Sequence, residues 1–205
     1  MANTCFTAYV IDGKRKEVQS LFSKMNYLEK RKKPLEGSSF GNTWLGNLVI
    51  KLGGDWRKVY CRGAWSDLEW NGSILRFNTE TAWGPMNEVF KFIKTIYPSL
   101  KIYYQAEEDG MGVFITNDTD GCYFSDRFRV EYDLDYEYFT TLNGVCGYVS
   151  GIICKEVSTK AELEAAINEW NGDQEDDDKM IYFNEYEVVP DEHLWILSDG
   201  GWLED

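Results

Sequence analysis

Apolar side chains recur near the start of the chain with two different periods, and these periods predict its first elements. Residues 5–11 form a β-rich run that ends in an Asp-Gly turn. After the turn, apolar residues are spaced as on one face of a helix, at Val18, Leu21, Phe22, Met25 and Leu28. The pattern therefore predicts a strand followed by an amphipathic helix.

Strand-like runs dominate the next part of the sequence. Residues 43–54 are a strand candidate, with a helical approach as an open alternative for its start, and two or three strands follow them. Asn71 and Gly72 suit the positive φ angles of a hairpin turn. Along 74–81, successive residues belong to two partly distinct faces, as expected for a strand.

The segment RFNTETAWGPMNEVFKFI, residues 76–93, joins the last of these strands to a second predicted helix. Pro85 suits the first helical position, and Pro98 ends the helix. Its apolar stripe consists of Val89, Phe92, Ile93 and Ile96. Glu80 has no neighbouring histidine and no metal-like spacing, so we interpret the corner around Trp83 as architectural rather than catalytic.

Three further strand patterns follow the second helix, and together they predict the fold class of the first domain. Residues 100–118 predict a strand, an acidic bend and a second strand, and 122–133 predict another strand. Residues 1–135 are therefore predicted to form an α+β domain in which two helices cover one face of an antiparallel sheet.

Residues 136–205 are predicted to form an acidic α+β extension packed on the first domain. Residues 141–157 are small and apolar and are interpreted as a strand pair or a buried segment. A helix over 159–171 is the clearest in the chain, because Thr159 and Glu162 fit a capping box. An acidic loop, a strand over 180–189 and an acidic, aromatic tail complete the extension.

Two stretches resemble a known family. They are MANTCFTAYVIDGKRKEVQSLF and FNTETAWGPMNEVFKFIKTIYPSLKIYYQAEEDGMGVF. Both resemble the YubB-type ferredoxin-like domain of plasmid, conjugative-element and phage proteins, over about residues 1–133. The resemblance implies a ferredoxin-like sheet and a mobile-element setting. It implies no catalytic residues.

Charge is divided unevenly along the chain, although the net charge is −14. Residues 1–65 carry 12 Lys and Arg against 5 Asp and Glu, a net charge of +7. Residues 66–170 carry a net charge of −10, and residues 171–205 carry −11. The 32 Trp, Tyr and Phe residues exceed what a core of this size takes, so some are expected on a binding surface.

Enzyme chemistry finds little support in the sequence. The five cysteines include no CxxC pair and are expected to be reduced thiols. The single histidine, His193, lies beside Asp191 and Glu192 in the sequence. It is interpreted as a surface imidazole, although a Cys–His dyad remains open. We therefore predict that the protein is not an enzyme and has no catalytic residue.

No metal or cofactor is predicted either. The segment Asn117–Gly121 resembles a calcium loop, but Arg127 stands where the closing Glu is needed, so a turn is expected. The sequence contains no phosphate-binding glycine motif. It also shows no signal peptide and no long apolar run, which predicts a cytoplasmic protein without a membrane partner.

The leading hypothesis is a non-enzymatic, protein-binding factor of a phage or mobile element. It would dock on a basic host protein that targets nucleic acid, in an anti-CRISPR or antirestriction role, with carboxylates in place of phosphates. The predicted surface combines acidic residues with aromatic anchors: Asp173, Glu175, Asp176, Asp177, Asp178, Glu185, Tyr186, Glu187, Asp191, Glu192, Trp195 and Trp202.

A different class of function remains as the alternative. Tyr103, Phe114 and Tyr123 are candidates for exposed sheet aromatics that bind a small ligand or single-stranded nucleic acid. The net charge of −14 disfavours direct nucleic-acid binding at long range. The basic patches at 14–16 and 30–33 are interpreted as solvated faces, with local nucleic-acid contact left open.

Overall fold

The computed structural model describes residues 3–194 of the chain. These residues form two compact units: 3–119 together with 188–194 make the first, and 120–187 make the second. Both contain helices and strands, so the chain belongs to the α+β class, as predicted. The second unit is inserted into the first, because the chain leaves the first unit and later returns to it.

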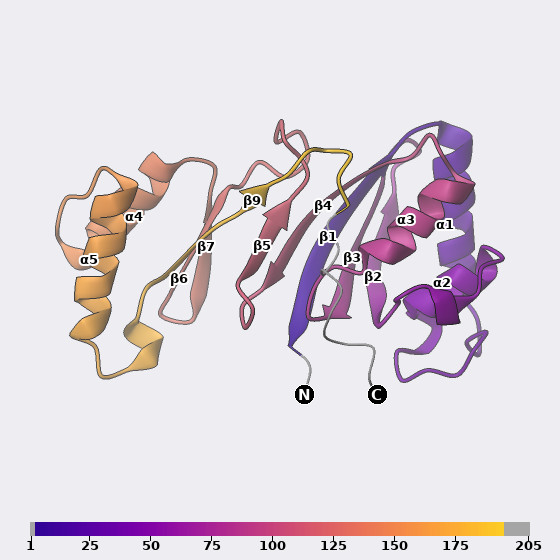
Figure 1. The fold of residues 1–205 in the computed structure, drawn as a ribbon, viewed down its shortest axis with the longest axis horizontal. Helices are drawn as coiled ribbons and strands as arrows, with labels where there is room; N and C mark the ends of the chain where they lie inside the picture. The colour runs from indigo at the N-terminus through magenta and orange to yellow at the C-terminus, as the bar shows by residue number, and fades with distance from the viewer. Residues whose placement is uncertain (1–2, 195–205) are drawn as a thin grey trace. The chain divides into compact units, whose positions relative to one another are not determined.

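The first unit is built on a six-stranded sheet with the order β2-β3-β1-β4-β5-β9 (Figure 1). Its strands are β1 (Thr4–Asp12), β2 (Gly63–Trp70), β3 (Leu75–Ala82), β4 (Lys101–Glu108), β5 (Val113–Thr116) and β9 (Glu187–Val188). β1 is antiparallel to both β3 and β4, and β2 is antiparallel to β3.

Three helices cover one face of this sheet: α1 (Arg15–Glu29), α2 (Leu45–Lys51) and α3 (Asn87–Ile96). The buried residues of all three helices share one core with alternate residues of the strands. Tyr9 of β1 lies in this core, with its ring 5.3 Å from Phe77 and 4.1 Å from Phe90. Its hydroxyl donates to Asn87 Oδ1 at 2.9 Å, which ties the central strand to the start of α3.

The predicted strand over 43–54 is wrong, because this segment forms α2 after a short 3₁₀ turn at Gly41–Thr43. Leu45, Leu48 and Val49 have helical spacing and are fully buried in the core. Short apolar runs do not distinguish a buried strand from a buried helix, which explains the error.

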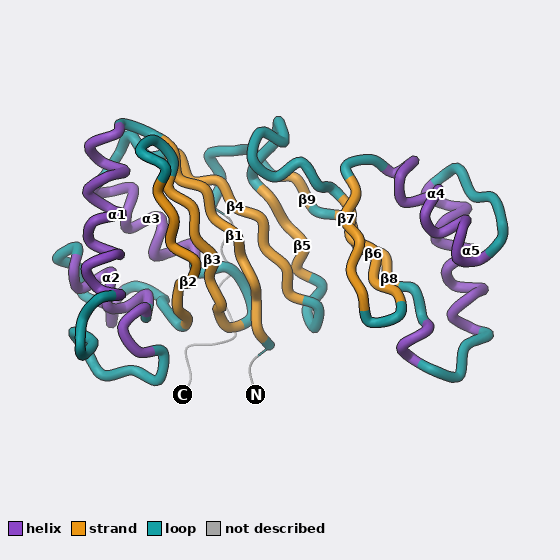
Figure 2. Tube along the Cα trace, turned by 180° about the vertical axis from the view of Figure 1, so that it is seen from behind, coloured by secondary structure: helices purple, strands orange, loops and turns teal. Residues whose placement is uncertain are grey.

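The second unit has its own three-stranded sheet, in the order β7-β6-β8 (Figure 2). The elements are β6 (Phe128–Tyr132), β7 (Asp135–Phe139), α4 (Leu142–Ile153), α5 (Lys160–Gly172), a 3₁₀ turn at Asp177–Lys179 and β8 (Tyr182–Glu185). Phe128 and Val130 of β6 share a second core with the buried residues of α4 and α5.

The strand pair predicted over 141–157 is also wrong, since α4 occupies most of this segment. Thr141 caps the helix by accepting a hydrogen bond from the backbone N–H of Gly144. Val145, Cys146 and Val149 bury one face of α4. Several glycines in the segment have low helix propensity, and they concealed the helix from a pattern-based prediction.

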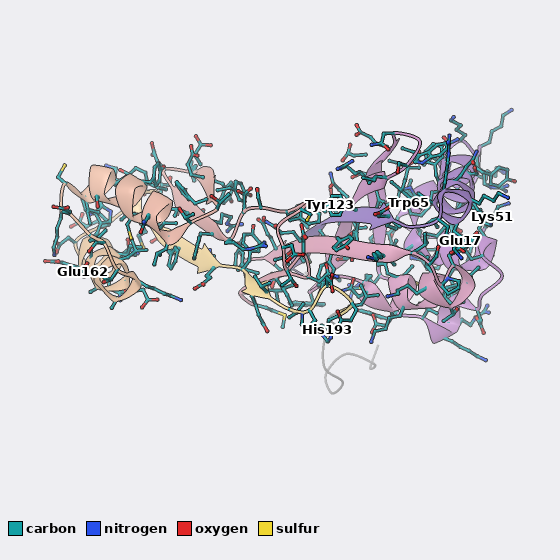
Figure 3. All side chains as sticks on the ribbon, turned by 90° about the horizontal axis from the view of Figure 1, so that it is seen from above. Glu17, Lys51, Trp65, Tyr123, Glu162 and His193 are labelled. Atoms are coloured by element: carbon teal, nitrogen blue, oxygen red, sulfur yellow. The ribbon has the colours of Figure 1, made fainter. Side chains whose placement is uncertain are left out.

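The boundary between the two units differs from the one predicted from the sequence, because strands pair over long distances in the chain. The predicted boundary after residue 135 falls inside the second unit, because β6 pairs with β7 and β8. The strand predicted over 180–189 is divided into β8 and β9 by Tyr186. The predicted helix over 159–171 is confirmed as α5, with its capping box formed by Thr159 and Glu162; Figure 3 labels Glu162.

The first unit holds the departing and returning chain segments together. The Thr119 hydroxyl donates to the carbonyl of Val189 at 3.1 Å, and the backbone N–H of Val189 donates to the carbonyl of Thr116 at 3.0 Å. The Asn117 side-chain amide donates to the carbonyls of Ile102 and Asp191, both at 2.8 Å. The segment that resembled a calcium loop thus begins with a structural clamp.

Trp83 lies at the corner between β3 and α3 with a φ of 71°, in the left-handed region. Its backbone N–H donates to the carbonyl of Asn3 at 2.9 Å, and the Thr81 hydroxyl donates to the carbonyl of Gly84 at 2.7 Å. These bonds fix the corner, although a bulky residue is costly in this conformation. The Trp83 side chain is half-buried, so its removal would expose the residues beneath it.

We expect Trp83→Ala and Trp83→Gly both to lower the free energy of unfolding, because both remove the ring. The alanine variant should be the less stable of the two by about 1 kcal/mol, because only glycine tolerates positive φ without steric cost. Urea unfolding of the two variants and the parent protein measures this difference. An alanine variant at least as stable as the glycine variant would contradict a strained corner.

Candidate partner-binding surface

The charge asymmetry of the sequence follows the structural division. Residues 120–187, the second unit, carry 17 Asp and Glu against 5 Lys and Arg, a net charge of −12. Residues 3–119 carry 13 acidic against 16 basic residues, a net charge of +3. The acidic character of the protein is therefore concentrated in the inserted unit.

One face of the three-stranded sheet in this unit carries exposed tyrosines. Because strand residues alternate between faces, Phe128 and Val130 point into the core while Arg129 and Glu131 point to the other face. The register places Tyr138 opposite Arg129, and both Tyr136 and Tyr182 opposite Glu131. We call this surface the tyrosine face; it consists of Arg129, Glu131, Tyr136, Tyr138, Tyr182 and Asn184.

The three tyrosines are available to a partner. Tyr136 is 48% exposed, and Tyr138 and Tyr182 are each 44% exposed. Tyrosine is enriched at interface hot spots, because it buries a large ring while its hydroxyl forms a hydrogen bond. Three such side chains on neighbouring strands make this face a candidate for binding a protein.

Arg129 supports the tyrosine face from within the sheet. Its guanidinium carbon lies 4.7 Å from the centre of the Tyr136 ring, and its Nη2 lies 3.7 Å from Glu131 Oε2. The Arg129 side chain is almost fully buried, whereas Tyr136 is exposed. The cation therefore holds the tyrosine ring in place from below.

Acidic residues gather at one end of the tyrosine face. Asp133 and Leu134 form the turn between β6 and β7, both with positive φ, and Leu134 is exposed. The backbone N–H of Asp133 donates to the carbonyl of Asp178 at 3.0 Å, which joins this turn to the acidic loop. We call this group of residues the acidic rim: Asp133, Asp135, Asp176, Asp177 and Asp178.

Part of the predicted partner surface is thus brought together. The exposed residues Asp176, Asp177 and Asp178 adjoin the tyrosine face, and Asp173 and Glu175 are exposed immediately before them. Glu185 lies at the other end of β8, where it forms an ion pair with Lys160.

Other members of the predicted surface lie elsewhere. Glu187 is exposed in β9, and Asp191 and Glu192 are exposed in the first unit. Tyr186 is only 2% exposed, so its side chain is buried instead of serving as a surface anchor. Trp195 and Trp202 lie outside the described residues.

The pattern-based prediction missed Tyr136, Tyr138 and Tyr182. Their signal is the alternation of acidic and aromatic residues in Asp135–Phe139, which places both tyrosines of β7 on one face. This signal becomes useful only once β7 is known to be an edge strand, since every residue but the last is then exposed.

The aromatics proposed for ligand binding on the larger sheet do not form an exposed platform. Phe114 is buried, Tyr103 is partly buried, and Tyr123, labelled in Figure 3, lies outside the strands. The exposed ring on this sheet is Phe6, and its strand neighbours in register are Glu80 and Glu107. Carboxylates on both sides of Phe6 disfavour a bound phosphate.

Candidate catalytic and metal-binding groups are dispersed in residues 3–194. His193 is exposed, and its backbone N–H donates to the carbonyl of Pro190 at 2.8 Å. Within the described part of the chain, no group of three or more His, Cys, Asp or Glu is placed to hold a metal ion. Over the same residues, no helix has the length and apolar character needed to cross a bilayer.

The comparisons with known proteins return no relative: no family model, curated protein or solved structure matches the chain.

The thiols differ sharply in their expected reactivity. Burial raises the pKa of Cys5 and that of Cys61 to about 11, whereas Cys122 and Cys154 are exposed. At pH 8, iodoacetamide should therefore alkylate Cys122 and Cys154 in the folded protein and leave Cys5 and Cys61 unmodified, because the thiolate is the nucleophile. Peptide mass spectrometry measures the order of labelling. Labelling of Cys61 as fast as Cys122 would contradict the buried environment.

Proposed function

We propose that the protein is a non-enzymatic, protein-binding factor of a phage or mobile element. It acts in the cytoplasm by covering the nucleic-acid-binding surface of a basic host defence protein, in an anti-CRISPR or antirestriction role. The observation that carries the proposal is the tyrosine face, bordered by the acidic rim, on a unit with a net charge of −12.

The two components of this surface have different physical roles. Exposed tyrosines supply contact area and hydrogen bonds, and removing one from the centre of an interface typically costs about 2 kcal/mol or more. Carboxylates of the acidic rim attract a basic partner over longer distances and raise the association rate. The partner that fits both components has a positively charged surface with apolar or planar groups, as nucleic-acid-binding proteins do.

The acidic rim is suited to replace phosphates because two chain segments that lie side by side both supply acidic residues to it. The turn at Asp133 and the loop at Asp178 are joined by a backbone hydrogen bond. Neighbouring carboxylates repel one another in the free protein, and a row of Lys or Arg side chains would relieve that repulsion. This gain favours a basic partner over a neutral one.

We also propose that the first unit is a ferredoxin-like domain of the YubB type. The strand order β2-β3-β1-β4, with antiparallel neighbours, supports this assignment. So do the helices that follow β1 and β3 in the chain. Helix α2 and strands β5 and β9 are then additions to the basic unit.

Alanine at Tyr136 and Tyr182 should weaken inhibition of the target at least tenfold, because both anchors lie on the tyrosine face. The assay titrates the purified protein into a panel of guide-loaded nuclease effectors and restriction enzymes. The assay then measures, for each effector or enzyme, the fraction of labelled target DNA that stays bound to it as the protein is added. The Phe6→Ala variant, which removes an exposed ring from the first unit, should inhibit as the parent does.

A charge-matched pair of variants tests the acidic rim. Neutralising Asp135, Asp177 and Asp178 to Asn should slow association with the target and reduce its salt dependence. Neutralising Glu156, Glu164 and Glu169 to Gln changes the net charge equally, but Glu164 and Glu169 lie on α5, whose buried side packs on the opposite face of the sheet. Equal effects of the two triple variants, or no inhibition of any effector by the parent protein, would refute the proposal.

A further inference from the structure

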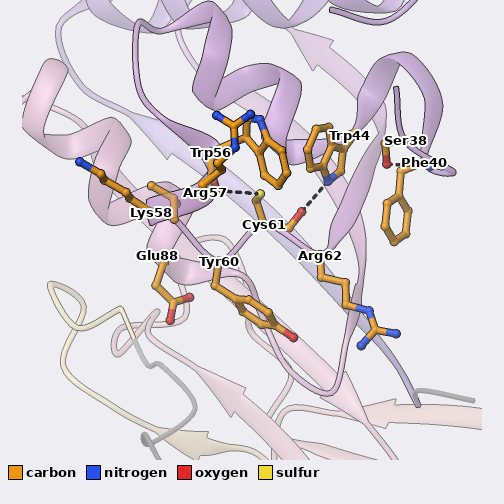
Figure 4. A pocket seen from close by; sticks show the side chains of 11 residues that line it. Ser38, Phe40, Trp44, Trp56, Arg57, Lys58, Tyr60, Cys61, Arg62 and Glu88 are labelled. Carbon is orange, nitrogen blue, oxygen red and sulfur yellow. Dashed lines mark hydrogen bonds between the residues drawn. The ribbon is translucent and has the colours of Figure 1, made fainter. Parts of the chain in front are cut away.

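A second candidate site lies in the first unit and involves none of the acidic rim. A cavity of about 590 Å³ opens between the segment before α2 and the segment that leads into β2 (Figure 4). Its volume falls within the usual range for small-molecule sites. Its side chains are of two main kinds, aromatic rings and cations.

The aromatic side of the cavity is held rigidly. Trp44 is buried, and its indole N–H donates to the carbonyl of Cys61 at 2.8 Å. The Trp56 ring packs edge-on against Trp44, with 5.1 Å between ring centres, and is itself only half-buried. Tyr60 and Phe40 add two more rings to the lining. A planar ligand can therefore stack on the Trp56 ring without first ordering it.

The cationic side of the cavity is formed by Arg57, Lys58 and Arg62, all of which are exposed. The Arg57 guanidinium lies 5.1 Å from the centre of the Trp56 ring, so a cation and a stacking surface are adjacent. Asp55 lies 3.7 Å from Arg57 in an exposed ion pair, which is weak enough for an anion to replace. Glu88 is the acidic residue among the lining groups.

The surrounding charge favours an anion here. The cavity residues before α2 and those of the segment leading into β2 belong to the part of the chain, residues 1–65, that carries a net charge of +7. The overall charge of −14 is concentrated in the second unit and does not describe this site. An anionic ligand that also has a planar ring matches both sides of the cavity.

We propose that this cavity binds a nucleoside phosphate. The base stacks on Trp56 and Tyr60, the phosphate binds Arg57, Lys58 and Arg62, and the Glu88 carboxylate accepts hydrogen bonds from base N–H or sugar hydroxyl groups. The ligand is either a free nucleotide or the terminal nucleotide of a single strand, since both present the same groups. This site is separate in sequence and in charge from the partner-binding surface proposed above.

Isothermal titration calorimetry with named probes tests the proposal. The probes are the four ribonucleoside 5′-monophosphates, the corresponding uncharged nucleosides, inorganic phosphate, and eight-nucleotide single strands of uridylate and of deoxythymidylate. We expect at least one monophosphate or one strand to bind more tightly than inorganic phosphate and than the uncharged nucleoside. Comparable affinity for a monophosphate and a strand identifies a free-nucleotide site, whereas binding of strands alone identifies a strand site.

Three variants locate the binding. Arg57→Glu with Lys58→Glu should weaken binding at least tenfold, and Trp56→Ala should weaken binding of nucleotides without affecting inorganic phosphate. Arg15→Glu with Lys16→Glu makes the same change in net charge at the exposed start of α1 and should alter affinity by less than threefold. Circular dichroism confirms that each variant is folded.

Three outcomes would overturn the proposal. The first is that no nucleotide or strand binds at 1 mM, and the second is that inorganic phosphate binds as tightly as every nucleotide. The third is that the Arg15 and Lys16 variant loses as much affinity as the Arg57 and Lys58 variant, which would indicate attraction to overall charge rather than to the cavity.

Discussion

The tyrosine face, the candidate partner-binding surface, depends on a buried guanidinium in the middle strand of the second unit. Arg129 lies between Phe128 and Val130, which point into the core, and its own side chain is directed to the opposite face. Burial of a cation is costly because it loses hydration, and Glu131, at 3.7 Å, and the Tyr136 ring, at 4.7 Å, offset part of that cost. Their positions are therefore constrained together, which gives the exposed tyrosine a defined orientation before any partner arrives.

The two units divide the electrostatic properties of the chain between them. The second unit has a net charge of −12, whereas residues 3–119 have a net charge of +3. The two parts would therefore attract different classes of ligand. Exposed charges separated by more than about 8 Å are largely screened at physiological salt, so each surface acts according to its local charge. The net charge of the whole chain is consequently a poor guide to what either surface binds.

Local patterns in the sequence were sufficient for elements with long apolar stripes or clear caps. Helices α1, α3 and α5 belong to this group: α1 and α3 have stripes, and α5 has the Thr159–Glu162 capping box. Helices α2 and α4 were missed, because one is a short buried run and the other contains several glycines.

The acidic loop of the candidate site was predicted from composition. The burial of Tyr186 and the exposure of Tyr136 could not be predicted in this way. Both depend on which strands pair with one another, and strand pairing is not determined by the local sequence.

The hydrogen bond between Thr119 and Val189 has a consequence for how such a protein can evolve. It places the Thr119 hydroxyl 3.1 Å from the carbonyl oxygen of Val189. The two points at which residues 120–187 are attached are therefore adjacent within the first unit. A module attached through two adjacent points can be lengthened, shortened or exchanged without breaking the host sheet, since insertions are tolerated where chain ends meet. Recombination at this junction would supply new binding specificities on an unchanged scaffold.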